Sequence, residues 1–115
     1  MAELPLGQWS ITANGFLGVL NLTGVDANGN LSPTSMVFDD PIVGVWDGLS
    51  EKIEFIRVVS SNPKTHQVYT GYLMDRSAAM HQQFVFAGSF IAFGASGNIP
   101  QRTVYGWFAA LPRPS

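Results

Sequence analysis

Short runs in which apolar and polar residues alternate recur along the whole chain, and clusters of turn-forming residues separate them. The runs are rich in Val, Ile, Thr, Phe, Tyr and Trp, whose branched or aromatic side chains favour strands. The clusters contain Gly, Asn, Asp, Ser and Pro over lengths typical of hairpin connections. The pattern predicts eight strands, at Gln8–Ala13, Leu17–Gly24, Asn30–Val37, Pro41–Trp46, Lys52–Ser60, Gln67–Met74, Gln83–Phe93 and Thr103–Ala110.

Antiparallel strands joined by short sequential turns form a meander. In a chain of 115 residues, such a meander closes most economically into an up-and-down barrel, because closure removes the exposed sheet edges. An immunoglobulin-like sandwich is the competing architecture, but it requires Greek-key crossovers that short sequential turns disfavour. The sequence therefore predicts an all-β, eight-stranded antiparallel up-and-down barrel, with residues 1–115 as a single domain.

The stretch VDANGNL raises the question of a metal site, because Asp26, Asn28 and Asn30 alternate like the first oxygen ligands of a calcium loop. Such a loop needs Gly at its sixth position and Glu at its twelfth, where this chain has Leu31 and Val37. Asn-Gly between two strand-like runs is instead a strong hairpin signal. We expect a turn whose backbone is hydrogen-bonded by Asp26, and neither a metal nor a cofactor.

The composition limits the partners and the compartment of the chain. The net charge is −2 without any basic stripe, which argues against nucleic acid and anionic membranes. There is no cysteine, no apolar run long enough for a transmembrane helix and no visible signal peptide, so a soluble chain of unassigned location is expected. Charged residues make up 12% of the chain, about half the usual share. This shortage favours a homo-oligomer, although a surface rich in Ser, Thr, Asn and Gln is an alternative.

Two strands carry further information in their faces. Residues 83–93 are apolar on both faces, with Phe86 and Phe90 on one and Val85 and Ile91 on the other. A strand with two apolar faces is buried on both sides, so a second subunit is predicted to cover its outer face. Arg57 shares an otherwise apolar face of its strand. It is either a ligand-facing charge or a residue at the barrel rim that pairs with a carboxylate.

Several segments resemble the avidin/streptavidin family. The opening GQW is similar to the Gly-x-Trp of its first strand, and IVGVWD is similar to its Leu-Thr-Gly-x-Tyr-Asp strand. LNLTGVDANGNLSPT resembles its second hairpin, IEFIRVV its Phe-x-Phe-x-Val strand, and VYTGYL its Trp-Ser-Gly-Gln strand. The resemblance covers about the first two-thirds of the chain. It implies an avidin-like barrel, often a dimer or tetramer, with a ligand mouth at one end.

The same resemblance implies that most biotin contacts are unmatched. Asn14 is the candidate for the family's ureido-binding Asn, whereas Trp46 stands where the family has Tyr. Val59 and Tyr69 stand where the family has Trp residues that stack on biotin. Because a hydrogen-bonded site loses affinity steeply when its partners are missing, we expect weak biotin binding or none.

No catalytic signature is present in the sequence. The two histidines, His66 and His81, lack the spacing of a metal pair, and no Gly-x-Ser-x-Gly motif occurs. Asp39 and Asp40 precede a proline and are typical of a turn. We therefore expect no enzyme activity and no catalytic or metal-binding residues.

Apolar walls with a few convergent polar groups suit a small-molecule site. The candidates are aromatic and polar residues near predicted strand ends, namely Trp9, Asn14, Trp46, Phe55, Tyr69, Phe86 and Trp107. Core packing is the alternative for each of them. The expected function is non-catalytic binding of a small molecule or peptide at the barrel mouth. A self-assembling barrel without a cavity and a small-barrel protease inhibitor, with AELPLGQW as its inhibitory arm, are the alternatives.

Overall fold

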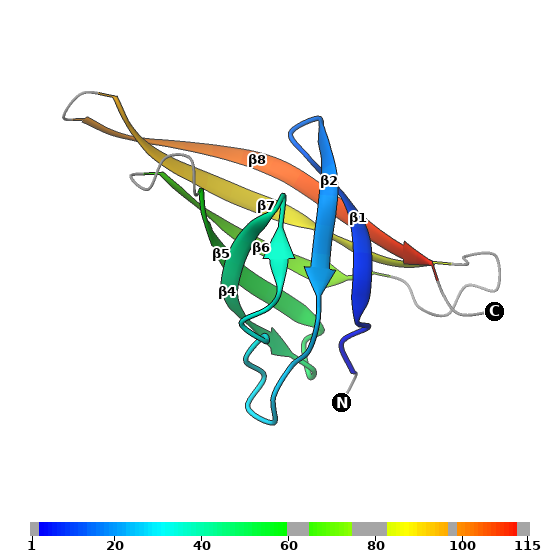
Figure 1. Cartoon of the computed structure of the whole chain (residues 1–115). Coiled ribbons are helices and arrows are strands. Elements are labelled where there is room, and N and C mark those ends of the chain that lie inside the picture. The colour runs from blue at the N-terminus through cyan, green and yellow to red at the C-terminus, as the bar shows by residue number, and fades with distance from the viewer. Residues whose placement is uncertain (1–2, 60–64, 75–82, 97–98, 113–115) are drawn as a thin grey trace.

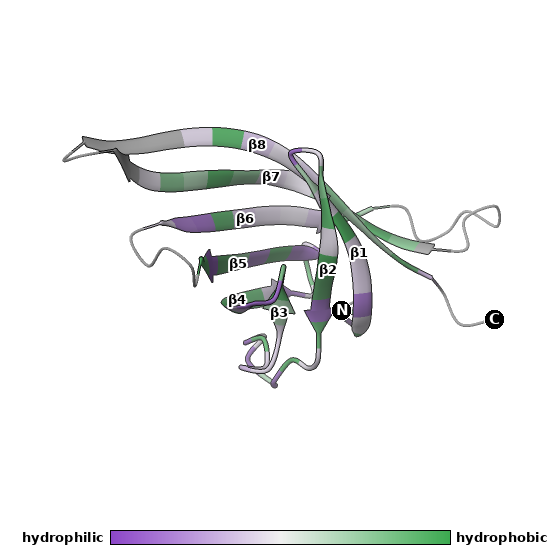
Figure 2. Cartoon of the chain, turned by 45° about the horizontal axis from the view of Figure 1, so that its top comes forward, coloured by the Kyte–Doolittle hydropathy of each residue, from purple (hydrophilic) through white to green (hydrophobic). Residues whose placement is uncertain are grey.

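The computed structural model describes residues 3–59, 65–74, 83–96 and 99–112, except for the side chains of residues 83, 95–96 and 99–102. The described strands are β1 (Gly7–Ala13), β2 (Phe16–Leu22), β3 (Met36–Val37), β4 (Asp40–Asp47), β5 (Lys52–Val58), β6 (His66–Leu73), β7 (Gln83–Ser96) and β8 (Ile99–Pro112). Each strand pairs antiparallel with the next, and β8 pairs with β1 to close the barrel. Figure 1 shows this closure, and Figure 2 shows β4 to β8 side by side in chain order. The predicted eight-stranded up-and-down barrel is confirmed.

Two tight hairpins border one end of the barrel, which we call the mouth. Asn14 and Gly15 connect β1 to β2, with φ angles of 49° and 82°. Phe38 and Asp39 connect β3 to β4, with φ angles of 49° and 65°. Positive φ at both central residues matches the twist of the flanking strands, and Asn-Gly adopts it readily. Phe rarely does, so the second turn holds a strained aromatic residue.

The predicted strand Asn30–Val37 is wrong in its extent, because only Met36–Val37 forms β3. Before it, the Ser35 amide donates to the Ser32 carbonyl at 2.9 Å, which closes a turn around Pro33. Pro33 has no N–H for a strand ladder, and Ser and Thr side chains compete for backbone partners in such turns. Asn30 still forms an isolated bridge with Val45 of β4.

The stretch VDANGNL forms the expected turn. The Oδ1 atom of Asp26 accepts hydrogen bonds from the amides of Asn28 and Asn30, each at 2.9 Å. These bonds, led by those from Asn30, lower the pKa of the Asp26 carboxyl. A bridge between Val25 and Leu31 closes the loop. The prediction that Asp26 stabilises the turn backbone is confirmed.

The barrel interior below the mouth is packed with side chains. Trp107 is buried, and its Nε1–H donates to the carbonyls of Thr70 and Ser89 at 3.2 and 3.1 Å. Its indole ring crosses Gly71, where a Cβ atom would overlap the ring. A Cβ atom on Gly88 would overlap the Thr70 carbonyl. Gly71 thus gives the indole ring its space, whereas Gly88 lets β7 lie close to the backbone of β6.

The N-terminal segment closes the end opposite the mouth. Leu4 is buried there, and the Nε1–H of the fully buried Trp9 donates to the Pro5 carbonyl at 3.2 Å. Because an indole N–H in an apolar interior needs an acceptor, this bond fixes the segment against the barrel. The segment proposed as an inhibitory arm therefore packs into its own barrel over Leu4 and Pro5.

The hairpin of β7 and β8 is longer than the predicted strands Gln83–Phe93 and Thr103–Ala110. Pairing continues beyond them to Ser96 and Ile99, whereas the pairing of β6 with β7 ends at Phe93. The glycine- and serine-rich sequence there predicts a loop, but the twisted two-stranded ladder extends through it. Figure 1 shows this arm of β7 and β8 projecting beyond the other strands.

A candidate ligand site at the barrel mouth

Four aromatic residues form a ladder across the inner wall. The strand registers place Phe55 of β5 opposite Tyr69 of β6, Tyr69 opposite Phe90 of β7, and Phe90 opposite Tyr105 of β8. Successive ring centroids are 4.7, 4.6 and 5.1 Å apart, and the first two pairs are stacked. Cross-strand aromatic pairs of this kind stabilise a sheet. The ladder gives the mouth one rigid aromatic wall.

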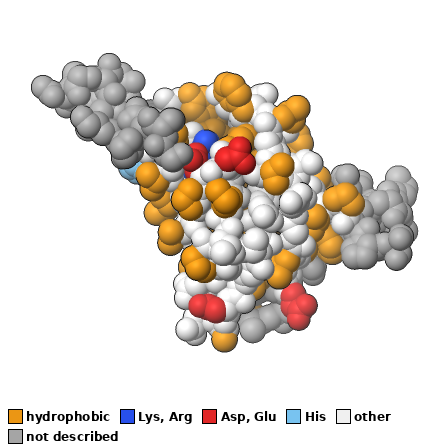
Figure 3. Space-filling model, in the orientation of Figure 1, with side chains coloured by type: hydrophobic (Ala, Val, Ile, Leu, Met, Phe, Trp, Pro, Cys, Tyr) orange, Lys and Arg blue, Asp and Glu red, His pale blue; other side chains and the backbone are white. Residues whose placement is uncertain are grey.

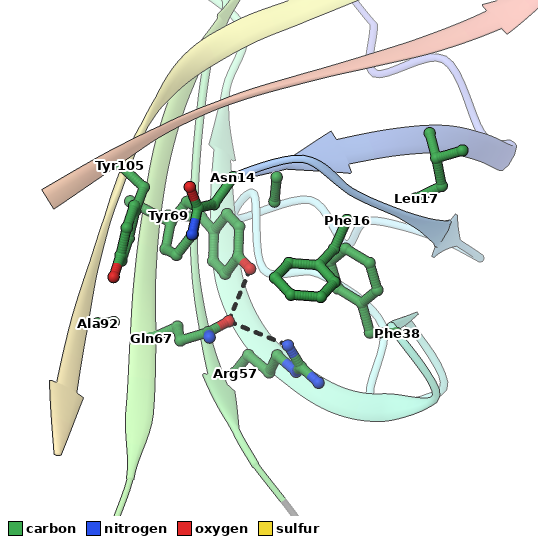
Figure 4. A pocket seen from close by; sticks show the side chains of 11 residues that line it. Asn14, Phe16, Leu17, Phe38, Arg57, Gln67, Tyr69, Ala92 and Tyr105 are labelled. Atoms are coloured by element: carbon green, nitrogen blue, oxygen red, sulfur yellow. Dashed lines mark hydrogen bonds between the residues drawn. The ribbon is translucent and has the colours of Figure 1, made fainter. Parts of the chain in front are cut away.

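A cavity of about 380 Å³ opens between this wall and the two mouth hairpins. Its volume lies in the range of small-molecule sites. The β1–β2 turn contributes Asn14, and β5 and β6 contribute Arg57 and Gln67. Five aromatic side chains line the rest of it, namely Phe16, Phe38, Tyr69, Phe90 and Tyr105. Figure 4 shows Phe16 and Phe38 together on one side and Tyr69 and Tyr105 on the other.

A hydrogen-bonded polar network lies at the edge of the cavity. The Nε and Nη2 atoms of Arg57 each lie 2.8 Å from Oδ2 of Asp40. The Nη1 atom of Arg57 donates to Oε1 of Gln67 at 3.1 Å, and the Tyr69 hydroxyl donates to the same oxygen at 2.7 Å. The last two bonds are drawn in Figure 4. Charge-assisted bonds of this kind hold a guanidinium group in one orientation.

The network is largely shielded from water. The side chains of Arg57 and Asp40 are 16% and 6% exposed. Burial raises the pKa of the Tyr69 phenol, and the nearby Arg57 charge opposes this rise. Tyr69 therefore stays protonated, and able to donate, at neutral pH.

Phe38 packs against the guanidinium group of Arg57. The guanidinium carbon of Arg57 lies 5.0 Å from the centroid of the Phe38 ring, which is a cation–π distance. On its other side the ring packs over Gly18, where a Cβ atom would overlap it. The strained backbone of Phe38 thus places an aromatic ring between a glycine and a buried cation. Strained residues held by their surroundings are concentrated at ligand sites.

The structure separates the seven predicted site residues into two groups. Asn14 and Tyr69 line the mouth cavity. The others are buried in the interior, where Trp9 and Trp46 contact Phe86 at centroid distances of 4.7 and 5.9 Å. Phe55 and Trp107 are also buried there, with centroids 6.0 Å apart. These five residues, Trp9, Trp46, Phe55, Phe86 and Trp107, pack the barrel core.

Several members of the site are absent from the predicted set, among them Phe38, Asp40 and Gln67. Asp40 was interpreted as a turn residue, but it begins β4 and pairs with Arg57. The alternation of side chains along a strand could have identified two of them as inward-facing, because Asp40 shares its face with Ile42, and Gln67 shares its face with Tyr69. The register of β5 and β6 then brings Gln67 into contact with Arg57, because the two residues are directly opposite each other.

A second opening of about 600 Å³ lies at the opposite end, beside Leu4 and Trp46. Two of its three carboxylates, those of Asp26 and Asp47, already accept hydrogen bonds within their own turns. The bond from the Leu49 amide is the main cause of the lowered pKa of Asp47. These groups stabilise loops, so this opening is a weaker candidate than the mouth.

Comparison with known proteins finds no matching family model and no curated protein of similar sequence. Within the described residues, no group of three or more His, Asp or Glu side chains is arranged to hold a metal ion. No helix in the same part of the chain is long and apolar enough to cross a membrane. His81 lies outside the described residues, whereas His66 begins β6 and stacks on Phe93 at 4.7 Å.

Proposed function

We propose that the protein is a non-catalytic barrel that binds a small molecule at its mouth. The observation that supports this proposal is a cavity of about 380 Å³ with five aromatic side chains and one hydrogen-bonded polar edge. Binding sites typically combine apolar walls with a few fixed polar groups. Because a barrel fold hosts many functions, the proposal rests on this site and not on the fold.

The chemistry of the polar edge favours recognition over catalysis. Arg57 and Gln67 supply a guanidinium group and a side-chain amide, which donate and accept hydrogen bonds but are not acid–base catalysts. Burial raises the pKa of Tyr69, so this phenol also keeps its proton near neutrality. General acid–base catalysis requires a group that exchanges a proton near the working pH. These three residues instead offer fixed donors and acceptors.

The avidin-like relationship remains part of the proposal, with weak biotin binding or none. Asn14 lies at the mouth, as the resemblance implies. Trp46, the counterpart of a biotin-binding Tyr, is instead buried in the core against Phe86. The protease-inhibitor alternative is not proposed, because Leu4 and Pro5 of the candidate arm are held by the barrel itself.

An NMR-monitored fragment screen tests the proposed function. Fragments that bind are expected to shift the amide signals of Asn14, Gln67 and Tyr105 and to leave those of Leu4 and Asp47 unchanged. D-biotin at the same concentration serves as the family ligand, and we expect it to cause little or no shift. A screen in which no compound of any charge shifts the mouth signals would contradict the proposal.

The outer surface supports a second proposal, that the barrel forms a homo-oligomer. The registers align Val43, Ile56, Val68, Ile91 and Val104 in one row across β4 to β8. Val43 and Val104 are 78% and 60% exposed. Among the described side chains, the outward faces of β6, β7 and β8 carry no Asp, Glu, Lys or Arg. Figure 3 shows one face of the molecule, where hydrophobic side chains are spread with few charged groups among them.

Sedimentation of two matched variants tests the assembly. Val104→Lys places a charge in the row, whereas Val19→Lys places one on β2, outside the row and at similar exposure. The proposal predicts that the first variant dissociates and the second keeps the mass of the unmodified protein. A monomer in all three samples would overturn it.

A further inference from the structure

Arg57 determines the direction of every hydrogen bond at the polar edge. A guanidinium group can only donate, so the Gln67 atom that faces it must be the side-chain oxygen. Since the Tyr69 hydroxyl bonds to that same oxygen, it must also donate. The side-chain nitrogen of Gln67 is therefore left on the opposite side of its amide group. The network thus fixes the orientation of the Gln67 side-chain amide, whose oxygen and nitrogen are otherwise difficult to tell apart.

The edge consequently presents more donors than acceptors. Of the five N–H bonds of Arg57, three serve the contacts to Asp40 and Gln67. Within the described part of the chain, the remaining two and both N–H bonds of the Gln67 amide have no acceptor. Arg57 lines the cavity, whereas Asp40 lies behind it on the Nε side and does not. A ligand at this edge is met by a cation and by N–H groups.

The rest of the cavity selects for a flat shape. Phe16 and Phe38 lie on one side of the cavity, and Tyr69 and Tyr105 lie on the other (Figure 4). Phe90 packs between Tyr69 and Tyr105 in the ladder. The Tyr69 and Phe90 rings are stacked at 4.6 Å with 17° between their planes, so they cover each other's faces and leave ring edges to the cavity. Offset or edge contacts with such rings favour an aromatic ligand over an aliphatic one of equal size.

We infer that the mouth takes a planar aromatic carboxylate, whose ring lies between the aromatic walls and whose oxygens accept from Arg57 Nη1 and Gln67 Nε2. This inference rests on the proposed function and specifies its ligand class. A carboxylate supplies two acceptor oxygens, which matches two donors from neighbouring strands. The Asp40 pairing holds the guanidinium in place through Nε and Nη2, and it leaves Nη1 for Gln67 and for a ligand.

Titration with three compounds of one shape tests the ligand class. We use 2-naphthoate, 2-naphthamide and 2-naphthylmethylammonium, which share a ring system and differ in charge. Calorimetry at pH 7 is expected to show naphthoate binding at least tenfold more tightly than the ammonium compound, with the amide between them. Decahydro-2-naphthoate, which keeps the charge but is not planar, is expected to bind at least fivefold more weakly than naphthoate.

The variant Gln67→Glu tests the role of the donors. It keeps an oxygen for Arg57 and Tyr69 but removes both N–H donors and adds a negative charge. We expect at least a tenfold loss of naphthoate affinity. Gln8→Glu, the same substitution at an exposed position on β1, is the matched control and should change the affinity less than twofold. Circular dichroism confirms that each variant is folded. If Gln67→Glu does not fold, the titration of the three naphthalene compounds with the unmodified protein still tests the ligand class.

The outcomes separate this inference from the proposed function. Equal affinity for all three naphthalene compounds, or a preference for the ammonium compound, overturns the carboxylate class while small-molecule binding stands. Unchanged naphthoate affinity in folded Gln67→Glu overturns the assigned donors. If none of the compounds binds and the fragment screen also finds no ligand at the mouth, the proposed function itself fails.

Discussion

The packed interior and the open mouth of this barrel are built from the same kind of residue. In the interior, Trp9, Phe86 and Trp107, on the neighbouring strands β1, β7 and β8, pack against one another and leave little space. At the mouth, Phe90 and Tyr105 line a cavity. The aromatic residues of both regions lie on the inner faces of their strands, so composition does not distinguish the two regions. The difference lies in what stands opposite each ring.

Whether an inward-facing aromatic residue is packed or lines a cavity depends on which side chains lie opposite its ring. In the interior, Gly71 lets the Trp107 ring approach the sheet closely, and the Phe55 and Phe86 rings pack around it. At the mouth, β3 has two residues and turns back at Phe38 and Asp39. Tyr69, Phe90 and Tyr105 stack on one another along the facing wall, and the cavity lies between them and this hairpin. The short β3 and its turn thus form one border of the cavity.

The largest expected effect comes from opening the interior. Trp107→Ala removes a buried indole and leaves the carbonyls of Thr70 and Ser89 without its N–H. We expect the free energy of unfolding to fall by about 3–5 kcal/mol. Urea denaturation followed by circular dichroism measures this loss. Phe108→Ala is the control, since that neighbour is 54% exposed and should cost less than about 1 kcal/mol. Equal losses would show that the two faces of β8 are not distinct.

The ion pair at the mouth gives the next largest effect. Arg57→Met leaves the buried carboxylate of Asp40 without its cation, and we expect a loss of about 3 kcal/mol in unfolding free energy. Replacing both groups, in Asp40→Leu/Arg57→Met, removes the unpaired charge and should restore stability to within about 1 kcal/mol of the unmodified protein. Denaturation of the two variants under identical conditions measures the difference. A double variant as unstable as the single one would contradict the pairing.

The strained turn separates stability from binding. Phe38→Gly relieves a positive φ angle that costs about 1 kcal/mol or more, but it also removes the ring over Arg57. We expect unfolding free energy to change by less than about 1 kcal/mol because the two effects oppose each other. Naphthoate affinity, in contrast, should fall about tenfold, since one aromatic wall is lost. Unchanged affinity in calorimetry would remove Phe38 from the site.

The smallest effect is the pH dependence that Tyr69 contributes. Burial raises its folded-state pKa above the ordinary value of 10.0. Below pH 10 both states keep the proton, and as the pH rises further the unfolded chain releases it first, so stability falls. The loss is at most about 1.4 kcal/mol per pH unit. Tyr69→Phe lacks this term, so its stability relative to the unmodified protein should improve between pH 9 and pH 11. A constant difference across that range would contradict the burial of the phenol.

The sequence predicts the barrel because its signal is local. Alternation and turn residues identify each strand within a few positions, and the order of short turns determines the neighbours. The Asn14–Gly15 hairpin and the Asp26 turn follow from the same local chemistry. The failure at Asn30–Val37 also has a local cause, because Pro33 and its serine and threonine neighbours favour a turn.

The site is less predictable because it depends on distances around the closed barrel. Alternation identifies Trp9, Phe55 and Trp107 as inward-facing but does not show which side chains lie opposite them in the barrel interior. Asp40 and Gln67 become recognisable only when the register places them beside Arg57. The positive φ of Phe38 has no sequence signal, since Phe is a poor residue for such a turn.

Mapping naphthoate by NMR tests the contrast between mouth and interior most directly. A titration that follows backbone amides and indole N–H signals reports on both regions in one sample. The account predicts saturable shifts at Asn14, Gln67 and Tyr105, with the Trp9 indole signal unchanged because its surroundings are fully packed. Shifts centred on Trp9 and Phe86, or no saturable shift at the mouth, would contradict it.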